Sequence, residues 1–181
     1  MDFFNNNPFE AWKIIQKIIE KKGNPPYSIG GALDLQFTSI KSLGNLISVV
    51  GDLDLRNTSI KSLGNLISVG GKLQLSNTPI QSLGNLQSVG GYLDLRGTQI
   101  ESLGNLTSVE NSLDLYGTPI QSLGNLQSVG GYLNLENTPI KSLGNLTSVG
   151  GNLLLRYTPL SKMYTEEQIS QMVNVGGNIY F

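Results

Sequence analysis

The sequence predicts a mainly β fold, a solenoid of stacked parallel strands closed by a helix at each end. A 20-residue unit repeats six times between Ser42 and Ser161 with no insertion or deletion, and a fixed period of this length is typical of solenoids. Leucines two residues apart recur in every unit, and both flanks of the repeat carry helical patterns. Because a solenoid devotes most residues to stacking, we expect function at the few positions that vary between copies.

Each unit contains one short predicted strand. Leu53 and Leu55 point to the same side of a strand because strand side chains alternate. The same pair recurs at residues 73 and 75, 93 and 95, 113 and 115, 133 and 135, and 153 and 155. Partial units at residues 28–40 and 175–181 repeat the pattern. We therefore expect about eight parallel strands with their leucines inward.

The position before each strand holds Gly51 and its equivalents, with Asn111 as the exception. Gly and Asn tolerate positive φ, so we expect this column to turn the chain through a left-handed conformation. The preceding column admits Val50 and Glu110 as well as glycine. We expect no comparable demand at that preceding column.

Two polar columns, those of Thr58 and Asn45, do not vary among the six copies. A polar side chain repeated at one turn can satisfy backbone groups that a bend leaves unpaired. We therefore predict a structural role for both columns in preference to a ligand role.

The flanks are predicted to cap the stack, which divides a single structural domain into an N-terminal capping helix (1–24), the solenoid (25–161) and a C-terminal cap with a short helix and the last strand (162–181). Asn7 and Pro8 suit the cap and first turn of a helix that runs to about Lys21. Its apolar stripe comprises Phe9, Trp12, Ile15, Ile18 and Ile19.

An alternative for the first helix is contact with a membrane surface or a partner, through Trp12 together with Lys13, Lys17 and Lys21. The second helix is expected at about residues 165–173, where Ile169, Met172 and Val173 would seal the other end of the stack.

The composition excludes several classes of function. The chain has 12 basic and 13 acidic residues, so it lacks the basic footprint of a nucleic-acid-binding protein. It has no cysteine and no histidine, which excludes disulfides, thiolate nucleophiles, histidine bases and Cys/His zinc sites. We therefore expect no enzyme, no cofactor and no metal.

The first residues, 1–7, do not combine a basic region with an apolar stretch, and no apolar run in the sequence approaches the length of a membrane span. We therefore expect no membrane span and a cytoplasmic location.

The candidate binding surface is the outward face of the strands, at the columns of residues 52, 54 and 56. Tyrosine and arginine dominate binding hot spots, and on this face they stand beside aspartates. The candidate residues are Arg56, Tyr92, Asp94, Arg96, Asp114, Tyr116, Tyr132 and Arg156, with Tyr157 following the last arginine. The alternative is that Asp and Arg pair across neighbouring strands and only keep the face soluble.

Two chemical roles for the aspartates are disfavoured. Asp94 and Asp114 on adjacent strands would place their carboxylates about 5 Å apart, as in retaining glycosidases. Any acidic column on stacked strands gives this spacing, and the face offers no evident cleft to raise a pKa. A calcium site that also used Asp54 would lack a recognisable loop of oxygen ligands.

The pattern L-x-L-x-x-T-x-I-x-S-L-x-x-L at residues 53–66 resembles a leucine-rich repeat in which threonine replaces the family's usual asparagine. Residues 142–155 are also similar to the coils of receptor L domains. The resemblance covers about residues 28–161 and the last seven residues. It implies a right-handed, leucine-rich-repeat-like solenoid, usually with a protein-binding role, and it provides no catalytic residues. The V-G-G-x-L-x-L-x-x-T-x-I units are also similar to uncharacterised repeat proteins encoded by bacteriophages.

These observations favour a non-enzymatic protein-binding scaffold that presents its variable strand face to a partner, which would be a host protein if the chain comes from a phage. Two other classes stay open. One is a structural, self-assembling component. The other is a carbohydrate or small-molecule binder that uses Tyr92, Tyr132 and the aspartates. A monomer is favoured over an oligomer.

Overall fold

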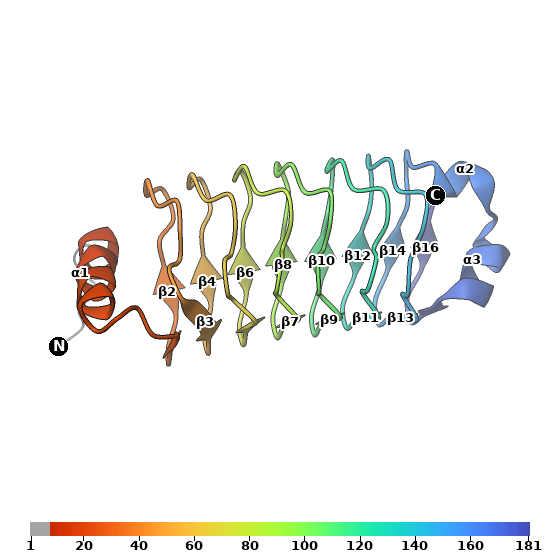
Figure 1. Cartoon of the computed structure of the whole chain (residues 1–181). Coiled ribbons are helices and arrows are strands. Elements are labelled where there is room, and N and C mark those ends of the chain that lie inside the picture. The colour runs from red at the N-terminus through yellow and green to blue at the C-terminus, as the bar shows by residue number, and fades with distance from the viewer. Residues whose placement is uncertain (1–7) are drawn as a thin grey trace.

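In the computed structural model, which describes residues 8–181, the repeats stack into a straight row of coils with helices at both ends (Figure 1). The predicted class is confirmed, because the chain is mainly β, its strands are parallel, and helices flank the stack. The coils repeat every 20 residues, so that Leu113 pairs with Leu133 and Leu133 with Leu153.

Each coil contributes two strands, and the described residues form two eight-stranded parallel sheets. Sheet A contains β1 (Tyr27–Ile29), β3 (Leu46–Val49), β5 (Ser68–Val69), β7 (Ser88–Val89), β9 (Ser108–Val109), β11 (Ser128–Val129), β13 (Ser148–Val149) and β15 (Asn174–Val175). Sheet B contains β2 (Leu33–Asp34), β4 (Leu53–Asp54), β6 (Leu73–Gln74), β8 (Leu93–Asp94), β10 (Leu113–Asp114), β12 (Leu133–Asn134), β14 (Leu153–Leu154) and β16 (Ile179–Tyr180).

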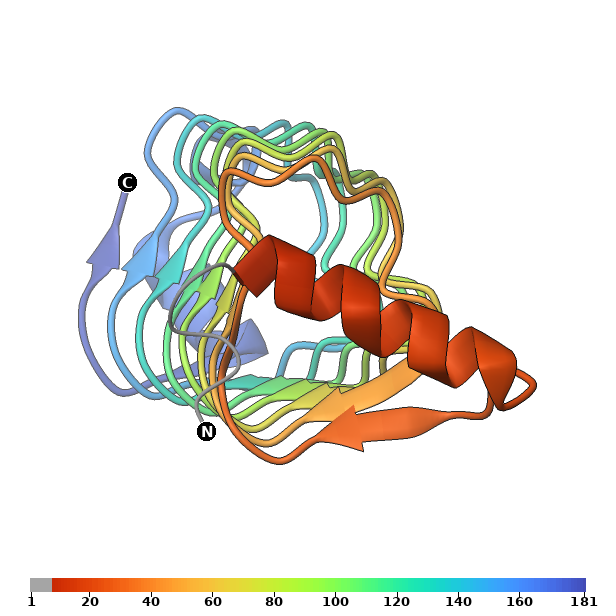
Figure 2. The same cartoon turned by 90° about the vertical axis from the view of Figure 1, so that its left-hand side faces the viewer.

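The prediction of one strand per coil, about eight in all, is therefore wrong in number. The predicted strands are those of sheet B, and the Ser-Val pairs that precede the glycines form the second sheet. Figure 2 shows the two sheets as adjacent walls that meet at one corner of the coil. The valines of sheet A from Val49 to Val149 and the first leucine of each sheet B strand from Leu33 to Leu153 point inward from these walls and are almost completely buried.

The prediction that the Gly51 column needs a positive φ is wrong. Gly51, Gly71 and their equivalents are absent from the residues with positive φ. What restricts this column is close stacking, because a Cβ on Gly91 would lie 2.7 Å from Gly71 C and from the Lys72 nitrogen. The preceding column is also tight, since a Cβ on Gly90 would overlap the carbonyl oxygen of Gly70. The expectation that this column needs no positive φ is nevertheless confirmed, and Val50 and Glu110 show that an exposed side chain can stand there.

Left-handed backbone occurs at two other columns. One is the glycine of the S-L-G-N-L segment, from Gly44 to Gly144, where φ is 57–61° in all six coils. The other follows sheet B, where φ is 55–70° and the residues are Asn, Gly, Phe or Tyr. The members of this second column are Phe37, Asn57, Asn77, Gly97, Gly117, Asn137 and Tyr157.

The threonine column has the predicted structural role. In each coil the threonine hydroxyl donates to the carbonyl oxygen three residues earlier, as Thr98 does to Leu95 at 2.6 Å. The asparagine column reaches into the preceding coil, where Asn65 Nδ2 donates to Asn45 Oδ1 at 3.0 Å. Polar groups at these bends are thus paired within the stack.

Helix α1 (Pro8–Lys21) lies across the N-terminal end of the stack (Figure 2). Trp12 is buried and packs against the ring of Tyr27, with the ring centroids 6.4 Å apart. Gln16 Nε2 donates to the Tyr27 hydroxyl at 2.6 Å. The capping role is confirmed, and the alternative use of Trp12 on an outer surface is wrong because this side chain faces the coils. The predicted cap residue Asn7 lies outside the described residues.

Two short helices, α2 (Leu160–Met163) and α3 (Glu166–Met172), stand at the other end (Figure 1). Thr165 and Gln168 form a capping box at the start of α3, and Ile169 is completely buried. The helix predicted at residues 165–173 is therefore confirmed. Helix α2 was not predicted.

Candidate functional site

The outward face of sheet B carries the candidate residues, and much of its polarity first serves the local fold. Asp34, Asp54, Asp94, Asp114 and Asn134 each accept a hydrogen bond from the backbone N–H two residues later, at 3.0–3.1 Å. Such side-chain to backbone bonds hold a turn. The Asp and Asn side chains of this column thus stabilise a turn in five coils. Only their remaining acceptor capacity is free for other contacts.

At the N-terminal part of the face, Asp54 and Arg56 of the same coil form a bidentate ion pair. Arg56 Nε and Nη2 donate to the Asp54 carboxylate at 3.0 and 2.6 Å. Burial acts to raise the pKa of Asp54, but hydrogen bonds from Arg56 and Gln74 outweigh it and hold that pKa below its ordinary value. Arg56 also donates to Gln36 at 2.9 Å.

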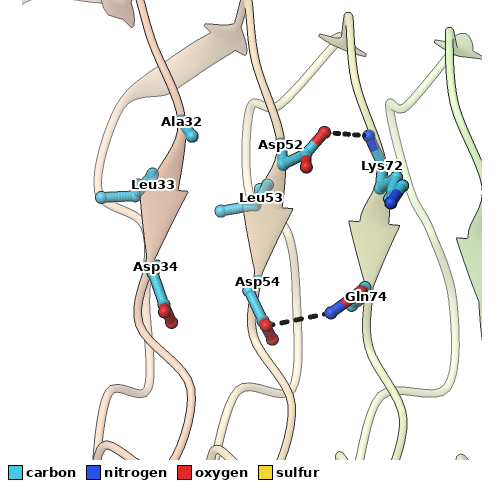
Figure 3. Close-up of a pocket in the computed structure, with 8 residues that line it drawn as sticks. All are labelled: Ala32, Leu33, Asp34, Asp52, Leu53, Asp54, Lys72 and Gln74. Carbon is cyan, nitrogen blue, oxygen red and sulfur yellow. Dashed lines mark hydrogen bonds between the residues drawn. The ribbon is translucent and has the colours of Figure 1, made fainter.

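A hollow of about 320 Å³ lies beside this pair, across β2, β4 and β6 (Figure 3). Its acidic lining is already engaged: Asp52 Oδ1 accepts from the Lys72 backbone N–H at 2.8 Å, and Asp54 Oδ2 accepts from Gln74 Nε2 at 2.9 Å. The floor includes Leu33. These bonds tie neighbouring coils together.

The centre of the face holds a second, denser cluster. Arg96 Nε and Nη2 donate to the Asp94 carboxylate at 2.9 and 2.7 Å, while Arg96 Nε lies 3.6 Å from Asp114 Oδ2 on the next strand. Asp94 and Asp114 are only 3% and 6% exposed. One guanidinium thus serves two buried carboxylates, and it is held mainly by Asp94, which raises the pKa of Arg96.

Two tyrosines close over this cluster. The rings of Tyr92 and Tyr132 lie 6.3 Å apart at 49°, although they stand two strands apart. They meet because the residue between them is Ser112, which is small and buried, and whose Oγ accepts from the Tyr132 N–H at 3.1 Å. The Tyr92 hydroxyl donates to Asp114 Oδ2 at 3.3 Å.

This cover has an electrostatic consequence. Burial is the main cause that raises the pKa of Asp114 above its ordinary value, against hydrogen bonds from Tyr116 and Tyr92. Burial likewise raises the pKa of Tyr92. Asp114 is therefore a carboxylate whose ionised form is poorly solvated, in contrast to Asp54.

The most exposed side chains of the central cluster are those of Tyr116, Tyr132 and Arg96. Tyr116 is 46% exposed and Tyr132 is 37% exposed, and Arg96 is also open to solvent. At the C-terminal part of the face, Arg156 lies 5.2 Å from the centre of the Tyr180 ring and 3.6 Å from Glu136 Oε1.

Of the eight predicted candidates, six gather at the centre: Tyr92, Asp94, Arg96, Asp114, Tyr116 and Tyr132. The other two stand apart, since Arg56 pairs with Asp54 and Arg156 with Glu136 and Tyr180. The alternative interpretation was that Asp and Arg pair across neighbouring strands. Asp–Arg ion pairs do form, but the short ones join residues two apart in the same coil.

Sequence reasoning missed Ser112. The signal was present in the column itself, which reads Tyr92, Ser112, Tyr132 on consecutive coils. A small residue between two large ones on stacked strands lets the large side chains meet. The same coil departs from the repeat at Glu110 and Asn111, so the exceptions to the repeat gather beside the cluster.

Within residues 8–181, no group of three or more acidic, cysteine or histidine side chains is placed to hold a metal ion. Over the same range, no helix is both long and apolar enough to span a bilayer.

The fold and this face define a capped parallel β solenoid whose scaffold is uniform and whose variation is concentrated on one wall. The chain matches no protein-family model, and no curated protein shows significant similarity to it.

Proposed function

We propose that this protein is a non-enzymatic scaffold that binds a partner protein through the outward face of sheet B. The observation that carries the proposal is the central cluster, which combines the exposed rings of Tyr116 and Tyr132 with an exposed arginine held by buried carboxylates. Aromatic and arginine side chains on a rigid support, near the centre of a surface, are the usual anchors of protein interfaces. The resemblance to leucine-rich repeats, whose usual role is protein binding, supports the same conclusion.

The rigidity of the support matters for affinity. Asp94 fixes Arg96 through two hydrogen bonds, and Asp114 fixes the backbone of Tyr116. Side chains that are already ordered lose less conformational entropy on binding. The two tyrosine rings that could stack on a sugar lean on each other instead, so a protein partner fits this surface better than a carbohydrate.

The test is affinity capture with matched variants. The double variant Tyr116→Ala, Tyr132→Ala removes two exposed rings of the central cluster. Truncation of a hot-spot tyrosine typically costs about 2 kcal/mol or more, so proteins retained by the wild type should be lost. The control is Ser88→Ala, Ser108→Ala on the outward side of sheet A, which should retain them.

Equal retention by the wild type and the tyrosine variant would refute the proposal. Loss with the serine variant alone would instead place the binding surface on sheet A. Circular dichroism of each variant should match the wild type, which separates loss of binding from loss of fold.

A further inference from the structure

Exposed apolar side chains gather near the two ends of the stack. Terminal caps of solenoids normally present a polar surface, because they replace the next coil by solvent. Among residues 8–181, eight of the eleven exposed large apolar side chains lie near the two ends, within residues 14–50 or 157–181. They are Ile14, Ile18, Phe37 and Val50 at one end, and Tyr157, Met163, Met172 and Phe181 at the other.

The N-terminal end combines apolar and basic side chains on α1. Ile14 and Ile18 are about half exposed and lie one helical turn apart. Exposed lysines at positions 13, 17, 21 and 22 flank them. Four lysines and two glutamates give residues 8–22 a net charge of +2. Since Ala11 and Trp12 are buried against the stack, the lysine-bearing side of the helix faces away from it.

The C-terminal end combines apolar and acidic side chains. Met163 on α2 and Met172 on α3 are also about half exposed. Met172 borders a hollow of about 210 Å³ whose lining includes Leu160, Tyr164 and Val173. Exposed Glu166 and Glu167 against the single Lys162 give residues 160–173 a net charge of −1.

We propose that the occupant of each end is the opposite end of a second copy of this chain. The Ile14 and Ile18 edge of α1 packs on the Met163 and Met172 surface of the next molecule, and the lysines of α1 face its glutamates. Burial of the four apolar side chains supplies the main stabilisation. The exposed charges add orientation and make the contact weaker as salt rises. The proposed head-to-tail contact predicts an oligomer, whereas the sequence favours a monomer.

The shape of the molecule decides what such a contact builds. The two complementary surfaces stand at opposite ends of a straight stack (Figure 1). Two molecules therefore cannot satisfy both ends, and a heterologous contact that does not close continues as an open chain. The outward face of sheet B takes no part, so each added copy would present another central cluster, whether or not that face binds a protein.

Sedimentation velocity from micromolar to millimolar concentration tests the proposal. The mean mass of the wild type should rise with concentration and pass beyond the dimer. A head variant, Ile14→Asp, Ile18→Asp, and a tail variant, Met163→Asp, Met172→Asp, should each remain monomeric. An equimolar mixture of the two variants should form heterodimers and nothing longer, because it contains one intact head and one intact tail per pair.

A wild type that stays monomeric over the whole range would overturn the proposal, and so would a mass that levels off at a dimer. Failure of the mixed variants to associate, with each variant showing wild-type circular dichroism, would exclude the assigned surfaces. If an aspartate variant unfolds, Lys17→Glu, Lys21→Glu should still weaken association, and Glu166→Lys, Glu167→Lys in the partner should restore it. Tyr116→Ala should associate like the wild type, which distinguishes end contact from contact through sheet B.

Discussion

Each coil turns at two corners next to sheet B, and the two corners use glycine for different reasons. At the corner before the strand, the backbones of successive coils approach so closely that a Cβ on Gly131 would lie 3.0 Å from the Ser112 nitrogen. At the corner after the strand, Gly117 has a φ of 70° and nothing within 4 Å of where a Cβ would stand. The first corner therefore disfavours side chains by packing, with Asn111 as its one exception, whereas the second admits residues that tolerate left-handed backbone.

The largest expected effect separates the two corners directly. Gly91→Val places a branched side chain against backbone atoms of the preceding coil, at 2.7–2.8 Å, which cannot move aside without disturbing the stack. We expect a loss of about 3 kcal/mol in the free energy of unfolding. The matched control, Gly117→Asn, puts a residue found at the equivalent position 137 into open space and should change stability by less than about 0.5 kcal/mol.

Urea denaturation measures both changes, with the slope m used to check that the unfolded reference is unchanged. Equal losses from the two substitutions would mean that backbone conformation, not packing, governs the first corner.

A smaller effect is expected at the threonine that closes the second corner. Thr98→Val keeps the shape of the side chain but removes the hydroxyl that donates to the Leu95 carbonyl oxygen in a buried site. The Leu95 oxygen still accepts the Thr98 backbone N–H at 3.2 Å, so the loss should be about 1 kcal/mol, the usual net contribution of one hydrogen bond. Thr107→Val removes a similar bond, to Gln87 at 3.1 Å, at a more accessible position.

For the Thr107 variant, water can replace the hydroxyl, so thermal unfolding should resolve a clear difference between the two threonines. A Thr107 loss as large as that of Thr98 would contradict the role assigned to burial at this corner.

Much of the scaffold was predictable because it depends on residues within one coil. The alternating leucines gave sheet B, and the threonine column gave the bonded bend. Sheet A was missed because each of its short strands buries a single valine, as β5 buries Val69, so the sequence shows no alternating apolar pair like Leu73 and Leu75. Gly51 was misread because glycine also marks close backbone approach, which depends on the neighbouring coil.

The candidate site divides in the same way. The sequence shows which residues stand on the outward face, but their burial depends on the adjacent coils. The tetrapeptide L-D-L-R occurs at residues 53–56 and 93–96. Asp94 is buried in the central cluster, to which the following coils contribute Asp114 and Tyr132, whereas Asp54 lies beside an open hollow. Local sequence cannot distinguish these two environments.

Tyr157 offers a stabilising change at the second corner. It has a φ of 60° and is 77% exposed. Left-handed backbone is unfavourable for a bulky residue, and the exposed ring gains little stabilisation from burial. Tyr157→Asn should therefore stabilise the protein by about 1 kcal/mol. The reverse change, Asn137→Tyr at a φ of 57°, should destabilise it by a similar amount.

Thermal unfolding of both variants measures this pair. A loss of stability in Tyr157→Asn would show that the exposed ring makes a stabilising contact that outweighs the backbone cost.

The smallest expected effect concerns the aspartates that hold the backbone entering the second corner. Asn134 already makes the same bond to the N–H two residues later, so Asp54→Asn and Asp114→Asn both keep the turn and remove a charge. The pKa of Asp54 is lowered from 3.8 in the folded protein, so its ionisation stabilises the fold above that value, and this contribution is lost as the pH falls further. The pKa of Asp114 is raised from 3.8, so the folded protein holds this proton more tightly, and that contribution is lost as the pH rises through the raised pKa.

The two substitutions should therefore act in opposite directions when unfolding is compared between pH 3 and pH 7. Relative to the wild type, Asp54→Asn should become less stable as the pH rises, because it lacks the stabilising ionisation. Asp114→Asn should become relatively more stable, because it no longer places a poorly solvated carboxylate beneath Tyr92 and Tyr132. Parallel pH profiles for the two variants would show that the tyrosine cover does not alter the environment of Asp114, and the distinction between the open and the covered part of the face would fail.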